Sequence, residues 1–413
     1  MLKGPDLAVI WFGAGINIVY MFIASSILLP NAGFWNTLIA IVIATTIAGV
    51  PFALAGYVGV EKGVTAMVGG RPAFGIRGSY ILSVINASTC VGFTAICTII
   101  SATSLNIVVN TLTGFSNLVL MISIISLIQW LFTLSGYRPS WKWLERIMCL
   151  TLALLLGLAM LVVILNFNLV AGIASITGTG MPLAVAIDIA IGAGPISWAT
   201  YVSDYTRHSK AGSRSSIGWV YLGFVPAAIW TMLVGVITGA ATGSYEPSII
   251  MATLGLGIPA LMIIVLSAIT TNFLDIYSGS VSIMNLSPKL NLKIAVSIVA
   301  ALSWIIALIP GFVENFEQFL FMVAYTLGPW VSIVLVDFFL INRRYEPIDL
   351  FESKKFWYWR GFNYRALLAW AIGVVVFFTF EYTWLVNYSP AALPSLSVSA
   401  LVYYALSKNR STC

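Results

Sequence analysis

The basic residues of this chain are confined to alternate gaps between its apolar stretches, and this pattern limits what the chain can fold into. All twenty Lys and Arg residues fall in seven clusters, at Lys3 and at 62–77, 138–146, 207–214, 289–293, 343–365 and 408–410. In membrane proteins, positive charge accumulates in the cytoplasmic loops. The pattern therefore predicts a protein that crosses a membrane many times and keeps both termini in the cytoplasm.

The distance between basic clusters predicts the number of crossings. Successive clusters are roughly 40 to 70 residues apart, which accommodates two apolar helices of about 20 residues each and a turn. Six such intervals predict twelve spans, near 7–30, 34–60, 78–111, 114–136, 143–167, 181–203, 216–242, 258–285, 293–312, 316–341, 364–381 and 390–407. We expect a single all-helical domain over residues 1–413, embedded in the inner or plasma membrane of the cell.

Composition argues against several other classes of protein. With 60% hydrophobic and 8% charged residues, the chain cannot form a water-soluble surface, and its net charge of +6 suits loops that contact anionic lipid rather than nucleic acid. The cysteines form no CxxC motif, and the single histidine, His208, lies in an expected cytoplasmic loop. We therefore expect no enzymatic site and no resident cofactor. A channel is also disfavoured, because channel filters usually come from repeated short loops.

Two of the expected spans contain residues that weaken a helix near mid-membrane. The first span contains Gly13, Gly15 and Asn17, and the sixth contains Gly192, Gly194, Pro195 and Ser197. Irregular backbone survives in a bilayer only where protein buries it or where it lines a cavity. Paired breaks therefore predict a binding site at the midplane. The alternative is that these glycines only allow close helix packing.

The eighth span is unusually polar. Ser267, Thr270, Thr271, Asp275 and Ser278 share one helix face. Their hydroxyls, with carbonyls freed in the first span, could surround a small hard cation such as sodium. The alternative is that each hydroxyl bonds back to a carbonyl of its own helix.

Buried carboxyls and aromatic rings supply the remaining candidates. Asp188 and Asp275 would each cost about 2.5–3.5 kcal/mol at a helix centre, which makes them candidates for carrying a proton if coupling uses protons. Asp204, at the end of the sixth span, is expected to pair with loop charges or to belong to an inner gate. Phe93 and Trp198 could stack a flat ring, although a lone aromatic in a span is usually packing.

An ordered series of motifs resembles nucleobase:cation symporter family 1, the purine/cytosine permease family. The motifs are Ile10-Trp-Phe-Gly, Gly70-Arg-Pro-Ala-Phe-Gly-Ile-Arg-Gly-Ser, Ser203-Asp-Tyr-Thr-Arg, Thr270-Thr-Asn, Gly328-Pro, Val336-Asp-Phe-Phe-Leu and Gly361-Phe-Asn-Tyr-Arg-Ala. Together they extend over nearly the whole chain.

The resemblance implies a leucine-transporter-type fold. In that fold two inverted five-helix repeats, here about 7–167 and 181–341, precede two additional helices at about 364–407. It also implies a secondary transporter that imports a heterocyclic base by alternating access. We expect the protein to be a monomer surrounded by membrane lipid. The coupling ion would be sodium, with protons as the alternative. The sodium ligands implied by the resemblance fall on Gly13, Ile16, Ser267, Thr270 and Thr271.

The resemblance also implies where the substrate binds. Phe93, in the Cys90-Val-Gly-Phe stretch of the third span, would stack one side of the ring. Pro195 stands where cytosine and hydantoin permeases carry an aromatic residue, so Trp198 could supply the second stack. The polar groups expected to form hydrogen bonds with the ring nitrogens are Asn17, Ser197, Asp275 and the backbone at Gly194. The stretch from Gly194 to Trp198 is more similar to the hydroxymethylpyrimidine branch of the family than to the cytosine permeases. Cytosine, another pyrimidine or purine, and hydroxymethylpyrimidine all remain open as substrates.

Overall fold

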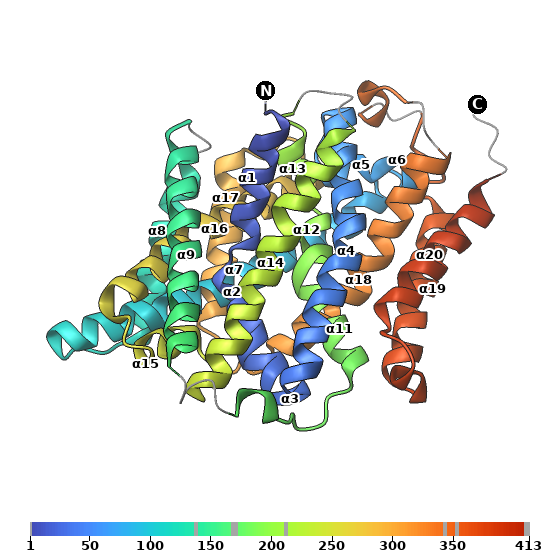
Figure 1. Ribbon diagram of the computed structural model, residues 1–413. Helices are drawn as coiled ribbons and strands as arrows, with labels where there is room; N and C mark the ends of the chain where they lie inside the picture. Colours follow the sequence, from blue (N-terminus) through green and yellow to red (C-terminus); the bar gives the residue numbers. More distant parts are fainter. Residues whose placement is uncertain are drawn as a thin grey trace.

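The computed structural model describes residues 2–135, 139–166, 172–209, 214–341, 345–351 and 355–408, with the side chains of 139–145 excepted. The described residues form a bundle of helices joined by short loops (Figure 1). Several basic loop residues used in the topology prediction, among them Arg138, Arg343 and Arg410, lie outside the described part.

Within the described residues, eight helices are long and apolar enough to cross a membrane. Six of them are α4 (Phe34–Lys62), α7 (Gly78–Thr113), α9 (Pro139–Leu165), α14 (Ser215–Thr242), α16 (Gly257–Leu286) and α19 (Tyr364–Glu381). The seventh is α18 (Phe316–Val336), which continues as a π-helical turn, Asp337–Ile341. The eighth is composite: α11 (Leu183–Ile191), a π-helical stretch η3 (Gly192–Ile196), α12 (Ser197–Ala199) and α13 (Ser203–Thr206).

Four further segments complete the apolar part of the bundle. The pair made by α1 (Gly4–Gly15) and the stretch from Ile18 to Ala32 passes the same length test but bends by 42°. That stretch consists of α2 (Ile18–Phe22), a π-helical turn η1 (Ile23–Leu28) and α3 (Leu29–Ala32). Three apolar helices are shorter: α8 (Leu118–Leu134), α17 (Leu292–Ala307) and α20 (Ala392–Ser407). The segments follow the predicted order, while the count of twelve membrane crossings stays a prediction.

Helix ends fall where the backbone can turn. Both α4 and α7 end at a glycine in the left-handed conformation, Gly63 with φ 66° and Gly114 with φ 71°. Such a glycine is a common helix terminator because it has no Cβ to clash. Within lipid, only a helix satisfies every backbone group internally, so the long apolar stretches between these turns become helical.

The bundle is held together by close packing of small residues. α14 lies against the first span, where a Cβ added at Gly223 would come within 2.4 Å of the Ala8 carbonyl oxygen, and one at Gly235 within 2.6 Å of the Met21 carbonyl oxygen. Small residues of this kind let membrane helices approach closely. The first span and α14 therefore form one tightly packed unit.

Large apolar side chains on the outer helices are exposed. Examples are Leu131 on α8, Leu154 on α9, Ile305 on α17 and Val375 on α19. In Figure 1, α8 and α9 lie at one edge of the bundle and α19 and α20 at the opposite edge. An exposed apolar band of this kind is what a hydrocarbon environment requires.

Three short helices fall in segments expected to be loops. They are α5 (Ala66–Gly69) and α6 (Arg71–Phe74) between α4 and α7, and α15 (Pro247–Thr253) between α14 and α16. α15 is preceded by its N-cap, Glu246, whose side chain accepts a hydrogen bond from the Ile249 amide at 2.9 Å. An N-terminal carboxylate of this kind caps the free amides of a helix.

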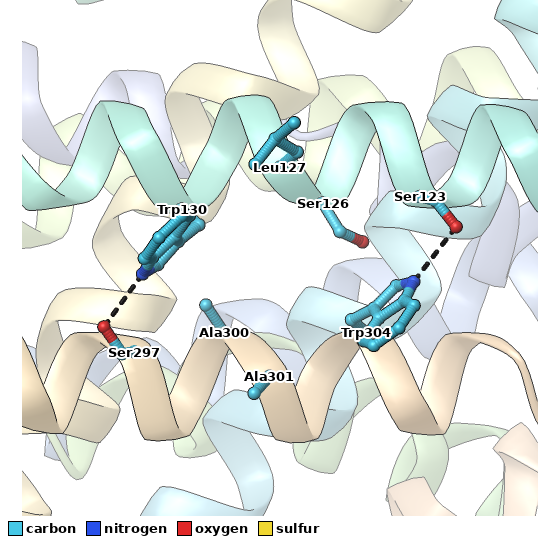
Figure 2. Close-up of a pocket in the computed structure, with 8 residues that line it drawn as sticks. All are labelled: Ser123, Ser126, Leu127, Trp130, Ser297, Ala300, Ala301 and Trp304. Carbon is cyan, nitrogen blue, oxygen red and sulfur yellow. Dashed lines mark hydrogen bonds between the residues drawn. The ribbon is translucent and has the colours of Figure 1, made fainter.

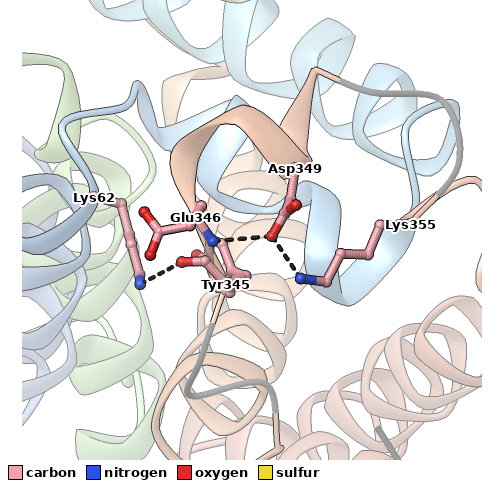
Figure 3. A network of polar contacts seen from close by, with 5 residues as sticks. All are labelled: Lys62, Tyr345, Glu346, Asp349 and Lys355. Carbon is pink, nitrogen blue, oxygen red and sulfur yellow. Dashed lines mark hydrogen bonds and ion pairs between the residues drawn. The ribbon is translucent and has the colours of Figure 1, made fainter. Parts of the chain in front are cut away.

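The loop that precedes α19 is anchored to the end of α4 (Figure 3). The Lys62 ammonium donates to the Tyr345 carbonyl at 2.8 Å and lies 4.4 Å from the centre of the Tyr345 ring. Asp349 accepts from the Glu346 amide at 2.9 Å and forms an ion pair with Lys355 at 2.5 Å. These contacts order the loop on the same end of the bundle as the N-terminus.

The same loop is also tied to the middle of the chain by a buried arginine. Arg71 donates to the Leu350 carbonyl at 2.8 Å and to the Asn285 side-chain oxygen, at the end of α16, at 2.7 Å. One guanidinium therefore joins three segments that are far apart in the sequence.

Candidate functional site

The first span is interrupted between Gly15 and Ile18, where the sequence predicts unwinding. Asn17 has an extended backbone, and its side-chain oxygen accepts from the Val19 amide at 2.9 Å. Asn17 is thus the N-cap of α2, a role that the sequence analysis did not consider for it. Its position at the break still places its side-chain amide near the middle of the span.

The interruption changes the hydrogen bonding of the backbone carbonyls. The Tyr20 amide donates to the Asn17 carbonyl at 2.9 Å, so it does not serve the Ile16 carbonyl as it would in a continuous helix. The Gly15 carbonyl accepts instead from the Thr231 hydroxyl of α14 at 3.1 Å. The Ile16 carbonyl is therefore released from the helical pattern, as the predicted cation site requires.

The sixth span changes course at Gly194, whose dihedral angles, φ −96° and ψ −117°, are not helical. Pro195 has no amide hydrogen, so it cannot bond to the carbonyl of the preceding turn. The Ser197 hydroxyl donates to the Gly194 carbonyl at 2.8 Å and to the Ala193 carbonyl at 3.2 Å. The serine thereby satisfies backbone groups that the break exposes.

Trp198 lies in an aromatic cluster just after this break. Its ring centre is 5.9 Å from that of Trp11 in an edge-to-face arrangement, 5.0 Å from that of Tyr201 and 6.2 Å from that of Phe224. Edge-to-face packing of this kind is favourable between aromatic rings. The cluster brings the first span, the end of the sixth span and α14 together.

Phe93 belongs to a different cluster. Its ring packs edge-to-face on Phe316 and Phe319 of α18, with ring centres 5.9 and 5.4 Å apart. Among the described residues, no ring contact joins Phe93 to Trp198. The structure therefore places the two aromatic residues predicted to stack the substrate in separate clusters.

Asp275 is held by a residue that the sequence analysis missed. The Tyr201 hydroxyl donates to the Asp275 carboxylate at 2.8 Å, and both side chains are buried. Nearby, the Tyr205 hydroxyl donates to the Leu274 carbonyl at 2.7 Å. Tyr201 lies one helical turn after Trp198, a spacing that could have suggested that both side chains face the same region.

A second polar link between the third, sixth and eighth spans was also missed. Thr200 donates to the side-chain oxygen of Asn86, whose amide donates to the Ser282 hydroxyl at 2.9 Å. Close by, Cys90 packs against α16, where a Cβ added at Gly279 would lie 3.1 Å from the Cys90 Cβ. Cys90 therefore lies at the contact between α7 and α16.

Two of the three hydroxyls predicted to bind sodium, those of Thr270 and Thr271, bond within α16. Thr270 and Thr271 both donate to the Ser267 carbonyl, at 2.8 and 3.0 Å. This is the back-bonded arrangement left open as the alternative. A hydroxyl that donates its proton to a carbonyl keeps its lone pairs for a cation, so the donor set of oxygens still fits sodium. None of these bonds joins the hydroxyls to Gly13 or Ile16, so the five-ligand site stays a prediction.

The two carboxyls expected to carry a proton or form a gate, Asp188 and Asp204, hold backbone amides. Asp188 accepts from the amides of Ala391 and Ala392, at 2.6 and 2.8 Å, where α20 begins. Asp204 accepts from the Ala66 amide at 3.0 Å, where α5 begins. These bonds give both residues a structural role, and their transport roles stay predictions.

The chain matches the sequence model of one protein family over almost its whole length. Residues 3–402 match the family described as permease for cytosine/purines, uracil, thiamine, allantoin. The chain is 28% identical to the hydantoin permease of Microbacterium maritypicum over 91% of this chain and 81% of that protein. It is 24% identical to the cytosine permease of Escherichia coli K12 over 81% of this chain and 76% of that protein. These relatives are permeases, not enzymes.

Solved structures agree with this likeness. An inward-facing conformation of Mhp1 is 24% identical, covers 98% of this chain and 90% of its own, and superposes with a TM-score of 0.82. A structure of Mhp1 described as a nucleobase-cation-symport-1 family transporter, closed with bromovinylhydantoin bound, is 25% identical. It covers 98% and 91% of the two chains, with a TM-score of 0.79. The predicted leucine-transporter-type fold is thereby confirmed.

Proposed function

We propose that this chain, which belongs to the family of permeases for cytosine/purines, uracil, thiamine and allantoin, imports a flat nitrogen heterocycle by alternating access with sodium as the coupling ion. The observation that carries the proposal is the pair of interrupted spans. Ile16 and Asn17 in the first span and Gly194 in the sixth leave the helical conformation inside a bundle that is otherwise mostly helical. Irregular backbone at such depth is characteristic of a transport site.

The heterocycle would bind where the two interruptions and α16 meet. Trp198 offers an aromatic edge or face, and Asp275, together with Asn17, offers oxygens and an amide that can pair with ring nitrogens and carbonyls. Tyr201 positions the Asp275 carboxylate through its hydroxyl. Phe93 would form the opposite wall together with its partners on α18. Cytosine, another purine or pyrimidine, a hydantoin and hydroxymethylpyrimidine are the candidates.

Sodium would be held by the released Ile16 carbonyl, the Gly13 carbonyl and the oxygens of Ser267, Thr270 and Thr271. When bound, sodium would supply positive charge that holds the end of α1 against α16. The residues of this chain supply neutral oxygens only, which suits a weakly bound monovalent cation that must be released after each cycle.

A panel of ligands tests both parts of the proposal. Purified protein is heated with pyrimidines, purines, hydantoins and hydroxymethylpyrimidine, each with sodium or with choline replacing it. We expect one ring class to raise the melting temperature, and sodium to increase that shift. Absence of stabilisation by every heterocycle would refute the substrate class. Stabilisation that depends on pH and not on sodium would instead support the proton-coupled alternative through Asp275.

A pair of variants tests the ion site separately. Thr270→Ala and Thr271→Ala should raise the sodium concentration needed for half-maximal ligand binding and leave binding at saturating sodium nearly intact. Thr238→Ala is the matched control, because this buried threonine of α14 also bonds back to its own helix, at 2.6 Å from the Val234 carbonyl. Equal effects in all three variants would show that only helix stability had changed.

A further inference from the structure

Tryptophans on the outside of the bundle have two kinds of partner. In the groove between α8 and α17, the indoles of Trp130 and Trp304 donate to the hydroxyls of Ser297 and Ser123 (Figure 2). Among the described residues that line this groove, none is charged. In the loop that leads into α19, tryptophan rings lie against arginines instead, so this second arrangement can attract a charged partner.

Two guanidinium groups lie over indole rings in the loop that leads into α19. The Arg77 guanidinium carbon is 5.1 Å from the centre of the Trp357 ring, and that of Arg360 is 4.9 Å from the centre of the Trp359 ring. Such contacts hold the charge in place through the ring face. They leave N–H groups at the edge of each guanidinium free to donate, and this fork of donors matches two oxygens of a phosphate.

A third arginine lies close to the first two. Arg365 is in the first turn of α19, and like Arg77 and Arg360 it is exposed. The Arg77 side chain packs on the turn before α19, where a Cβ added at Gly361 would come within 2.7 Å of the Arg77 Cγ. Within the described part of the chain, none of the three arginines has a carboxylate partner. Three uncompensated positive charges therefore surround one turn.

The turn that carries these charges has a strained backbone. Tyr358 and Arg360 have φ angles of 48° and 51°, in a left-handed region that bulky side chains rarely adopt. The turn is held by the start of α7, because the Gly361 carbonyl accepts from the amides of Arg77 and Gly78 at 2.9 and 3.3 Å. Strained residues persist where neighbouring contacts impose them, and they are frequent at functional sites.

The turn also lies where lipid headgroups are expected. It is at the end of the bundle that the charge pattern predicts to be cytoplasmic, and α19 lies at an edge of the bundle (Figure 1). Trp359 and Tyr364 are 58% and 50% exposed, with ring centres 4.8 Å apart, and such rings are typical of the headgroup level. Leu368 and Val375, on the same face of α19 as Tyr364, are exposed as well. This face offers a hydrocarbon path that starts at the arginines.

We propose that Arg77, Arg360 and Arg365 form a binding site for the headgroup of an anionic phospholipid, such as phosphatidylglycerol, in the cytoplasmic leaflet. The three guanidinium groups donate to the phosphate oxygens, and the acyl chains lie along the exposed apolar face of α19. Anionic lipids attract basic residues at this surface of a membrane. A zwitterionic headgroup carries its own cation, which the three arginines repel.

Two lipids with identical acyl chains test the charge selectivity. Purified protein in neutral detergent is titrated with dioleoylphosphatidylglycerol or dioleoylphosphatidylcholine, and the bound lipid is counted by native mass spectrometry. Each basic residue near an anionic lipid strengthens attraction roughly fivefold. We therefore expect one saturable phosphatidylglycerol that binds roughly 20- to 100-fold more tightly than phosphatidylcholine. Equal affinity for the two lipids would overturn the proposal. So would displacement by millimolar glycerol 3-phosphate, which has the phosphate but no acyl chains.

Paired charge removals show whether the bound lipid occupies this site. Arg360→Gln combined with Arg365→Gln should weaken phosphatidylglycerol binding roughly 30-fold. Lys289→Gln combined with Lys293→Gln is the control, because these lysines are exposed at the same predicted end of the bundle and lie outside the turn. The control removes the same charge and should leave the tight lipid bound.

A single variant separates the charge of the turn from its strain. Arg360→Gly removes one positive charge and also relieves the φ angle of 51°. It should weaken phosphatidylglycerol binding roughly fivefold without lowering the melting temperature. Equal weakening in the two double variants, or tight binding retained when Arg360 and Arg365 are both replaced, would overturn the proposal.

Discussion

Replacing Asp188 with Asn tests whether this carboxylate holds α20 or carries protons. The side chain is fully buried, and its two oxygens accept the amides of Ala391 and Ala392 at 2.6 and 2.8 Å. Asn keeps one accepting oxygen and turns its NH₂ group toward the second amide. One hydrogen bond is therefore lost and one buried amide is left unpaired, at a cost of about 1–3 kcal/mol. Asp188→Ala removes both acceptors and should cost about 2–6 kcal/mol.

Hydrogen exchange of the amides of residues 391–393 and 395 measures this loss locally. A cost of about 1–3 kcal/mol corresponds to roughly 5- to 150-fold faster exchange of these amides when opening is local. Heterocycle uptake and its dependence on pH should be unchanged in Asp188→Asn once the amount of folded protein is matched. Unchanged exchange combined with a shifted pH profile of uptake would refute the structural role and support proton transfer through Asp188.

Three further predictions concern the site, the packing and the loop. Tyr201→Phe removes the hydroxyl that bonds to Asp275, and it should weaken heterocycle binding about tenfold in calorimetric titration, whereas unchanged binding would place the substrate elsewhere. Gly15→Ala should destabilise the protein by about 1–3 kcal/mol, because the new Cβ would lie 2.7–2.9 Å from atoms of α14. Gly218→Ala, whose Cβ would meet nothing within 4 Å, should not lower the melting temperature. Lys355 donates a hydrogen bond to the Asp349 carboxylate and thereby lowers the pKa of that carboxyl in the folded protein. The ionised Asp349 therefore stabilises the fold above its unfolded pKa, and this stabilisation is lost as the pH falls through its folded pKa. The melting temperatures of the parent and Asp349→Asn should therefore converge on acidification, and a constant difference would contradict this.

The helical part of the fold could be predicted because its signals are local. The predicted span at 78–111 corresponds to α7 at Gly78–Thr113, and the span at 216–242 to α14 at Ser215–Thr242. The interruptions near Asn17 and at Gly194 were also predicted, since glycine and proline act on the backbone where they stand. The ends of several spans differ by a few residues, as at α17, which ends at Ala307 rather than near 312.

The parts that could not be predicted depend on contacts between distant residues. Asp188 was recognised as anomalous for a membrane span. Its partners lie at the start of α20, which follows the second predicted repeat in the sequence. The bond from Tyr201 to Asp275 also needs the sixth and eighth spans to be packed together first. Periodicity and charge pattern report on each helix alone, so they locate a polar residue without naming its partner.

Hydrogen bonds between the two predicted repeats and the end of the chain bear on how far this protein can be shortened. Arg71 depends on the Leu350 carbonyl, Asp188 on the amides at the start of α20, and Asp337 on the Tyr403 hydroxyl. A polypeptide cut after residue 341 would remove one hydrogen-bond partner of the buried Arg71 guanidinium and leave two buried carboxylates without these partners. We therefore expect that residues 1–341, which contain the two predicted repeats, do not fold as a separate unit without α19 and α20.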